Sequence, residues 1–380
     1  MTITIAMMRD VDIDDPVWDE FMYQASPEDM VNGTAESFDN LPVGSLSPQF
    51  TVGDGCDSAM ARPVLYIDPE TGERTADAGM SLRYCSHNIC VGTFNKEIIE
   101  NRGRRMGEDG LWGKQMCIFT SGLNLHRTPF GGRNFEYMSE CPTMTYLCSI
   151  IETTALEKTG VHAAPKHFCS NDQETQREGV AVFMREQAFR EGSLKAFEGA
   201  IRFAKVGGLM ASFERIGMVY ASYHYDLMTT VLRDEWNFRG FNVTDASKND
   251  VNIDIDKGYF NHYNEGFAAG TNQWCFNNDA RHGRVALEQA KENNDGYILL
   301  KIFESAKYWV HGVATSNIIN GMSAGDKIVP VTPMWQTAVR VAQVVSGVLF
   351  GAAAALTVVL SVVNTVKKQK GGADNGGICQ

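Results

Sequence analysis

The sequence predicts an α/β fold of the TIM type, a (β/α)8 barrel that is complete, incomplete or distorted, followed by a C-terminal transmembrane helix. Short apolar segments alternate with longer helical segments, a pattern typical of parallel sheets. Polar clusters follow four of the apolar segments, as catalytic residues do at the C-terminal ends of barrel strands. An open dinucleotide-binding sheet would carry a GxGxxG turn, which the sequence lacks.

The pattern divides the chain into five regions. Residues 1–14 are an N-terminal extension, 15–315 the barrel, 316–338 a linker, 339–366 the transmembrane helix and 367–380 a basic, glycine-rich tail. The barrel region opens with an amphipathic helix over 15–32, capped by Ser26 before Glu28. The apolar side chains on one face of this helix are Trp18, Phe21, Met22 and Met30.

The remaining elements follow in order. Residues 35–80 are rich in Gly, Pro, Asp and Ser and predict loops or short strands. The strands are predicted at 118–125, 162–168, 209–213 and 241–244. The helices are predicted at 96–114, where glycine breaks the helix, and at 141–158, 185–205, 225–235, 280–293 and 296–311.

Composition excludes several classes of function. The net charge of -12 and a pI near 5.2 argue against a nucleic-acid partner.

The nine cysteines contain no CxxC pair. Cys85 and Cys90 flank His87, but no second ligand pair follows, so we interpret them as buried or free thiols. The acidic run from Asp250 to Asp256 lacks the glycine and glutamate of a calcium loop. We therefore expect no metal and no cofactor.

Residues 341–363 form an uncharged apolar run of 23 residues, long enough to cross a bilayer as a helix. A buried helix of a soluble protein is the alternative, but apolar residues cover every face. Arg340 precedes the run and three lysines follow it, which predicts a cytoplasmic tail and an extracytoplasmic barrel. The N-terminus has no signal-peptide pattern. Either the helix directs insertion of a single-pass protein in the cell membrane, or an N-terminal portion is missing.

Two segments carry basic side chains in positions suited to a site. Arg127 and Arg133 flank a Pro-Phe-Gly-Gly turn in LNLHRTPFGGRNFEY, where they could bind hydroxyls, brace a carboxylate or join loops. Lys166 and His167 end a predicted strand, where both can reach one ligand. They could bind sugar hydroxyls, or Lys166 could form a Schiff base.

Asp245 follows the apolar strand FNVT directly. A carboxylate there can cap a structure or bind a metal. It can also be the nucleophile that attacks an anomeric carbon and forms a glycosyl-enzyme ester.

Six segments resemble, in order and spacing, the catalytic barrel of family 3 glycoside hydrolases, the β-glucosidase-like group, over roughly residues 15–315: NLHRTPFGGRNFEYMSE, KHFCSNDQETQR, REGSLKAFEGAI, LMASFERIG, VLRDEWNFRGFNVTD and EGFAAGTN. The resemblance implies that Asp245 is the catalytic nucleophile. It implies a sugar site formed by Asp54, Arg133, Lys166 and His167 and lined by Met210 and Phe213. Arg127, on the same glycine turn as Arg133, is a further candidate for this site.

The chain departs from that pattern at five positions: Cys56, Cys141, Glu214, Ala246 and Asn272. The family takes its general acid/base from outside the barrel core, and we cannot assign one to a residue here. Some members carry an accessory domain before the barrel and a membrane helix after it. The chain resembles the barrel and tail of such a protein, without that preceding domain.

These observations predict a membrane-anchored, retaining, exo-acting β-glycosidase that removes terminal β-linked sugars from oligosaccharides or glycosides. One alternative is a catalytically impaired or truncated sugar-binding or scaffold protein on the same barrel, which the departures favour. Another is a Lys166 Schiff-base aldolase, although no acid/base network specific to it is evident.

Overall fold

The computed structural model describes residues 3–35, 51–54, 66–67, 74–75, 84–113, 115–245, 263–275, 281–323 and 334–373. The chain forms two units, residues 1–328 and residues 329–380. Asp54 has a described backbone only, and Cys56, Ala246 and the acidic run 250–256 lie outside the described residues.

Parallel strands form the centre of the first unit. They are β1 (Thr51–Asp54), β4 (Gln115–Phe119), β5 (His162–Ala163), β7 (Gly208–Met210) and β10 (Phe241–Val243). One sheet has the order β1-β4-β5 and a second pairs β7 with β10. Single parallel bridges join Phe168 to Ala211 and Val243 to Gln273. The strands thus lie side by side in chain order, which is the arrangement of a TIM-type barrel.

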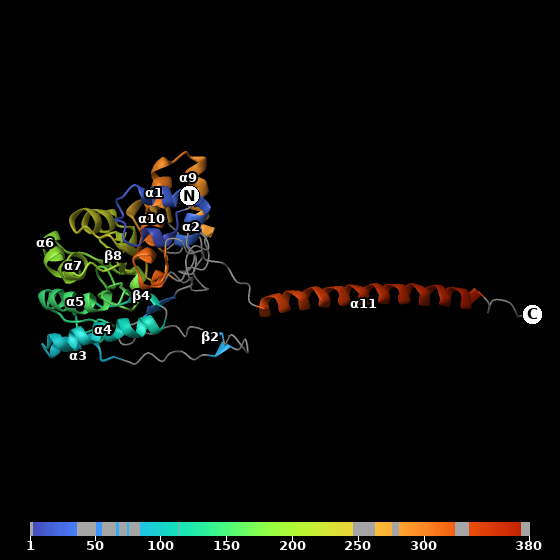
Figure 1. The fold of residues 1–380 in the computed structure, drawn as a ribbon, viewed down its shortest axis with the longest axis horizontal. Coiled ribbons are helices and arrows are strands. Elements are labelled where there is room, and N and C mark those ends of the chain that lie inside the picture. The colour runs from blue at the N-terminus through green and yellow to red at the C-terminus, as the bar shows by residue number, and fades with distance from the viewer. Residues whose placement is uncertain are drawn as a thin grey trace, which may run out of the picture. The chain divides into compact units, whose positions relative to one another are not determined.

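Helices separate these strands along the chain (Figure 1). They are α3 (His87–Gly92), α4 (Lys96–Trp112), α5 (Pro142–Glu157), α6 (Glu186–Phe189), α7 (Lys195–Arg202) and α8 (Tyr263–Ala269). A π-helical turn, Arg190–Leu194, joins α6 to α7, and the π-helical segment Asp226–Glu235 precedes β10. The predicted strand–helix alternation is therefore present, although the regular strands are shorter than predicted.

Smaller elements surround this core. Short helical turns are Ile5–Met8, Arg177–Gly179, Ala221–Tyr223 and Asn317–Ile319. A side sheet has the order β6-β8-β9, and β2 pairs with β3. These strands are β2 (Tyr66–Ile67), β3 (Arg74–Thr75), β6 (Ala181–Val182), β8 (Arg215–Ile216) and β9 (Val219–Tyr220).

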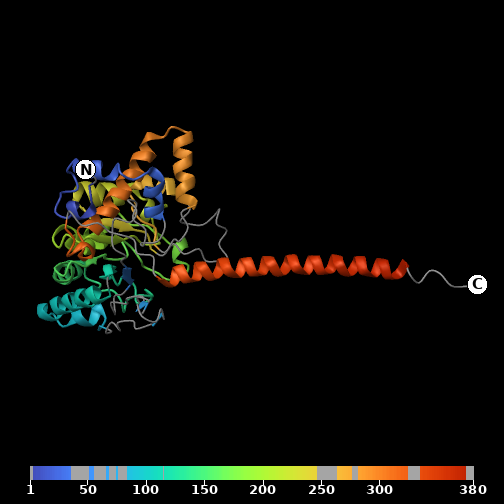
Figure 2. The same cartoon turned by 45° about the vertical axis from the view of Figure 1, so that its right-hand side comes forward.

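The amphipathic segment predicted at 15–32 is two helices, α1 (Val17–Met22) and α2 (Pro27–Ala35). Pro27 explains the break, because its ring fixes φ and removes the N–H that a continuous helix would use. Ser26 does cap the second helix, but Asp29 is its partner: the Asp29 N–H donates to the Ser26 hydroxyl at 3.1 Å. The predicted apolar face is buried, and α2 packs against both α9 (Arg281–Glu292) and α10 (Gly296–Ala314), which are drawn in orange in Figure 2.

Helix α4 runs unbroken over the segment where we predicted a glycine break. Two of its glycines, Gly103 and Gly107, face α5 and the turn that follows it, and they permit close packing there. A Cβ on Gly103 would lie 2.1 Å from the carbonyl oxygen of Glu152. A Cβ on Gly107 would lie 2.4 Å from the hydroxyl of Thr159. The glycines are therefore contact residues within a helix, rather than residues that end it.

Two hydrophobic clusters stabilise the first unit. One joins α1, α2 and α10 to the strands around Trp18, Phe241 and Trp309. The other fills the space between the strands and α4, α5 and α7, around Met106 and Phe197. Together they fix the strand ends from which the candidate site is built.

The second unit contains α11 (Met334–Ala373), a single helix of 40 residues (Figure 1). By length and composition, its segment Thr337–Thr365 could cross a membrane. The helix continues into the tail that we predicted to begin at residue 367.

We expect Gly103→Ala to destabilise the protein by about 1–3 kcal/mol, because the methyl group meets a backbone carbonyl that cannot move aside. Gly92→Ala is the matched control, since a Cβ there has nothing within 4 Å. It should be neutral or stabilise by up to about 1 kcal/mol. Urea unfolding followed by circular dichroism compares the two variants. A stabilised Gly103→Ala protein would contradict the tight α4–α5 contact.

Candidate active site

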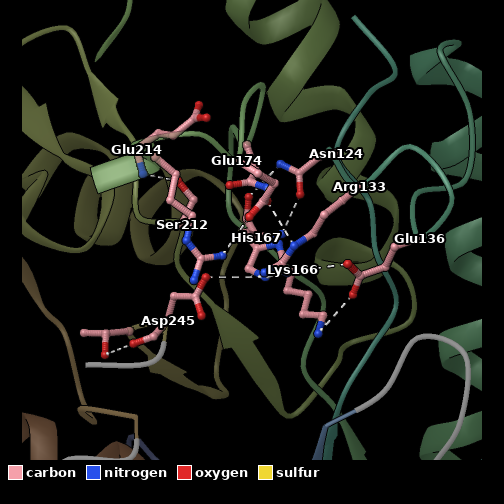
Figure 3. A network of polar contacts seen from close by, with 12 residues as sticks. Asn124, Arg133, Glu136, Lys166, His167, Glu174, Ser212, Glu214 and Asp245 are labelled. Carbon is pink, nitrogen blue, oxygen red and sulfur yellow. Dashed lines mark hydrogen bonds and ion pairs between the residues drawn. The ribbon is translucent and has the colours of Figure 1, made fainter. Parts of the chain in front are cut away.

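The backbone of Lys166 and His167 is held on both sides by residues that follow β4. The Lys166 N–H donates to the Ser121 carbonyl, and the Leu123 N–H donates to the Lys166 carbonyl, both at 2.9 Å. The side-chain amide of Asn124 donates to the His167 carbonyl at 2.8 Å and accepts the His167 N–H at 2.6 Å. Both side chains project toward the same polar network, the candidate site (Figure 3).

Lys166 forms a buried ion pair with Glu136. The ammonium lies 3.1 Å from Oε1 of Glu136, and only 5% of the lysine side chain is exposed. The other oxygen of Glu136 lies 3.5 Å from Nη1 of Arg133. One carboxylate therefore faces two cations, which fixes the positions of both (Figure 3).

His167 connects this ion pair to Asp245. Its Nε2 atom lies 2.9 Å from Nη1 of Arg133 and 3.5 Å from Oδ2 of Asp245. Its Nδ1 atom lies 3.1 Å from the hydroxyl of Tyr137, which accepts a hydrogen bond from Asn171 at 2.7 Å. Arginine can only donate, so we assign the proton of the neutral ring to Nδ1 and the acceptor lone pair to Nε2.

The electrostatics support a neutral histidine. Burial lowers the pKa of His167 well below its usual range, and the positive charges of Arg133, Lys166 and Arg177 lower it further. Burial by itself also lowers the pKa of Arg133, yet Tyr137 and the surrounding carboxylates hold it above its ordinary value. The site thus keeps Arg133 charged and its imidazole neutral at physiological pH.

Asp245 follows β10 and the buried Thr244, whose hydroxyl donates to the Asp245 carbonyl at 2.8 Å. Asp245 is 7% exposed. The structure thus brings Asp245, Lys166, His167 and Arg133 into one network, built from the segments that follow β4, β5 and β10.

The other residues predicted for the site have different surroundings. Arg127 is paired with Asp172. Met210 ends β7 and belongs to the hydrophobic core. Phe213 is buried, with the guanidinium of Arg177 4.1 Å from its ring centre. Asp54 is the last residue of β1, paired in register with Phe119, and its side chain lies outside the described atoms.

Sequence reasoning missed the acidic half of the network. Glu174 accepts from Nε of Arg133 at 2.9 Å and lies 3.1 Å from Nη1 of Arg177. Glu174 and Arg177 lie in the segment that follows Lys166 and His167, while Glu136 and Tyr137 directly follow the glycine turn. A charge count within those two motifs could have identified them, because every buried cation needs a counter-charge.

Two of the departures have structural explanations. Glu214 is fully buried and accepts the Gln173 N–H at 3.0 Å. Burial raises the pKa of Glu214 to about 7, although backbone hydrogen bonds oppose this rise. Asn272 accepts from Nη2 of Arg233 and from the Asn242 N–H, each at 2.9 Å. Asn272 therefore links the π-helical segment Asp226–Glu235 to β10.

A second buried network, the Glu152 brace, contacts the residues of the site. It consists of Glu152 on α5, Arg102 on α4, His87 on α3 and Ser121 after β4. Glu152 pairs with Arg102 and with His87, the latter at 3.0 Å, and accepts from the Ser121 hydroxyl. The ring of His87 reaches the Glu136 carbonyl through Nδ1 at 2.9 Å. Because a carbonyl only accepts, Nδ1 carries a proton.

Comparison with known families places this site in context. The family described as "Glycosyl hydrolase family 3 N terminal domain" matches residues 64–294. The chain belongs to glycosyl hydrolase family 3. The matched range contains all the residues of the candidate network and both partners of each ion pair in it.

Within the part of the chain that the structure describes, no group of three His, Cys, Asp or Glu side chains could hold a metal ion.

Relatives of the chain include β-glucosidases and exo-arabinopyranosidases. A "Beta-glucosidase" of Ruminococcus albus is 33% identical over 258 residues, 67% of this chain and 26% of that protein. An "Exo-alpha-(1->6)-L-arabinopyranosidase" of Bifidobacterium longum is 37% identical over 153 residues, 40% of this chain and 20% of that protein. The chain thus spans about a quarter or less of the length of these relatives.

Solved family 3 structures show the same fold. β-Glucosidase 3B from Thermotoga neapolitana, in complex with α-D-glucose, aligns with a TM-score of 0.67 at 23% identity. The alignment covers 82% of this chain and 44% of that one. This likeness establishes the barrel-type architecture of the family for the present chain.

We expect Glu152→Gln to lower the free energy of unfolding by about 3–5 kcal/mol, because it removes the buried negative charge that faces Arg102 and His87. Burial by itself raises the pKa of Glu152, but His87 and Arg102 outweigh it and hold this pKa well below its ordinary value of 4.5. A carboxyl group whose pKa is lower in the folded than in the unfolded state stabilises the protein at pH values above its unfolded pKa. This stabilisation is lost as the pH falls below the unfolded pKa.

The wild type should therefore lose stability as the pH falls below 4.5, and the glutamine variant should lose less over the same range. Urea unfolding across this pH range measures both slopes. Glu288→Gln on the exposed face of α9 is the control and should change stability by no more than about 0.5 kcal/mol. Parallel slopes for wild type and Glu152→Gln would show that the brace contributes no pH dependence.

Proposed function

We propose that the protein is a retaining, exo-acting β-glycosidase of the β-glucosidase type, with Asp245 as its nucleophile. The position of Asp245, whose Oδ2 lies 3.5 Å from the neutral His167 ring in a network that includes Lys166 and Arg133, carries this proposal. A nucleophilic carboxylate in a sugar site needs hydroxyl-binding groups beside it, and the network supplies them. The β-glucosidase names of several relatives support the substrate class.

The charged and neutral groups divide the binding of one sugar between them. Lys166 and Arg133 donate to sugar hydroxyls from fixed positions, because Glu136 holds both cations in place. Neutral His167 avoids placing a further cation beside Asp245, so the carboxylate keeps its nucleophilicity. We assign Asp54 and Arg127 to further hydroxyl contacts, and Met210 and Phe213 to the apolar lining of the subsite.

In the proposed reaction, a carboxylate oxygen of Asp245 attacks the anomeric carbon and forms an ester bond. The bond between that carbon and the leaving oxygen breaks, and its electron pair departs with the leaving group. Water then cleaves the ester and restores the configuration of the sugar. Among the described residues, none is assigned as the acid that protonates the leaving oxygen. The leaving group's own acidity should therefore control the first step.

We further propose that α11 anchors the protein in the cell membrane as a single-pass helix with the catalytic unit extracytoplasmic. The apolar segment Thr337–Thr365 and the lysines after it support this orientation. The substrate would then be a soluble oligosaccharide or glycoside outside the cytoplasm.

The catalytic prediction concerns leaving groups. Dinitrophenyl β-glucoside should give a burst or slow turnover, because its phenolate leaves without protonation. The hydrolysis of cellobiose should be roughly 10²–10⁴-fold slower than it would be in an enzyme with a positioned acid. Azide, which needs no deprotonation, should accelerate turnover by attacking the ester. Stopped-flow absorbance and product analysis measure each effect.

Asp245→Asn should reduce the aryl activity by roughly 10⁴-fold or more while the fold persists, because the amide is nearly isosteric and a poor nucleophile. Asp14→Asn, an exposed position paired with Arg239, is the matched control and should retain activity. If wild type cleaves cellobiose rapidly without azide, an acid/base is present in the chain. If the aryl substrate gives no burst, a sugar-binding function replaces the enzymatic one.

The anchoring prediction concerns membrane extraction. The full chain should stay with membranes after alkaline carbonate treatment. Leu349→Arg combined with Leu356→Arg should release it, because each arginine at the centre of a membrane helix costs about 2.5–3.5 kcal/mol. Met334→Arg, outside the uncharged run, is the control and should remain membrane-bound. Release of the wild-type chain by carbonate alone would contradict the proposed anchor.

A further inference from the structure

We propose that Cys85 and Cys90 form a reversible disulfide, which makes this pair a redox modification site at the start of α3. Their sulfur atoms lie 3.0 Å apart. A disulfide bond is about 2.0 Å long, so the pair needs to approach by only about 1 Å to close. This inference does not depend on the glycosidase activity.

The two thiols differ in their access to solvent, and this difference sets the order of reaction. Cys85 is exposed and precedes α3, whereas Cys90 lies within α3 and is 2% exposed. A soluble oxidant therefore meets Cys85 first. Cys90 can react only with a sulfur that is already beside it, which is the arrangement of an attacking and a resolving cysteine.

The oxidant is a low-molecular-weight disulfide such as oxidised glutathione. The Cys85 thiolate attacks one of its sulfurs, forms a mixed disulfide and releases one thiol. The Cys90 thiolate then attacks the Cys85 sulfur, forms the protein disulfide and releases the second thiol. The glutathione disulfide gains the two electrons and two protons that the protein loses.

The second step should accelerate as the pH rises. Burial and the hydrogen bond to Cys85 raise the pKa of Cys90 to about 12. Because the thiolate is the reacting form, Cys90 is the slow partner at neutral pH.

The position of the pair connects it to the candidate site. His87 lies between the two cysteines, and its ring contacts both Glu152 and the Glu136 carbonyl. Nε of Arg102 donates to the Cys85 carbonyl at 3.2 Å. Closing the pair ties the residue before α3 to the helix itself, and so restrains the segment that carries His87. In an oxidising compartment, as proposed for the catalytic unit, the pair would stay closed.

The test uses the full-length chain incubated with oxidised glutathione in mildly alkaline buffer, alkylated with iodoacetamide and digested with trypsin. Cleavage after Arg83 and after Lys96 releases one peptide, which contains both cysteines and no others. We expect this peptide to lack two hydrogen atoms and to carry no alkyl group. After reduction with dithiothreitol and a second treatment with iodoacetamide, both of its cysteines should be alkylated. The exposed Cys141 should instead be alkylated or glutathionylated.

Two variants separate the steps. Cys90→Ser should stop at a glutathione adduct on Cys85, and Cys85→Ser should leave Cys90 unmodified because it is buried. Oxidation should raise the apparent melting temperature of wild type by about 4 °C. That shift should be absent in Cys85→Ser and retained in Cys141→Ser.

Three outcomes would overturn the proposal. In the first, both thiols of the wild-type peptide are alkylated after oxidation. In the second, the mixed disulfide on Cys85 accumulates without resolving at alkaline pH. In the third, either residue is cross-linked to another cysteine, such as Cys56, in place of its neighbour.

Discussion

The buried carboxylate of Glu152 is the interaction on which the candidate site depends. It gathers groups from α3, α4 and the end of β4 around one negative charge on α5. Two of these groups continue directly into the site: His87 reaches the Glu136 carbonyl, and the Ser121 carbonyl accepts from Lys166. A buried charge of this kind tolerates few alternative arrangements, because each displacement leaves an ion in a medium of low polarity. The brace therefore specifies geometry more than it adds net stability.

The candidate site repeats this principle with opposite charges. Arg133 and Lys166 are cations held by Glu136 and Glu174, while His167 stays neutral between Arg133 and Asp245. A sugar has no charge, so a site that binds it must satisfy its own ions internally and still present donors at fixed positions. The acidic residues thus position the cations, which in the proposed function donate to the hydroxyl groups of the sugar. This division explains why removal of one member should disturb several others.

Much of the fold was predictable from sequence, because apolar strands and amphipathic helices are local patterns. The segment 141–158, with Pro142 near its start, forms α5 as predicted, and FNVT forms β10 and its first following residue. Other boundaries depended on distant partners. The glycines of α4 suggested a break, but α5 lies against them and turns them into contacts. The break at Pro27, in contrast, is a local signal that was present in the sequence, although the apolar periodicity there predicted a continuous helix.

The sequence by itself determined the family-like order of motifs and the positions of Lys166, His167 and Asp245 at strand ends, because strand termini follow from local hydrophobicity. Only the tertiary structure decided which groups meet. The pairing of Lys166 with Glu136, the neutral state of His167 and the approach of Cys85 to Cys90 depend on distances and burial. Those quantities arise when separate segments pack together, and electrostatic interactions in a protein interior change steeply with both.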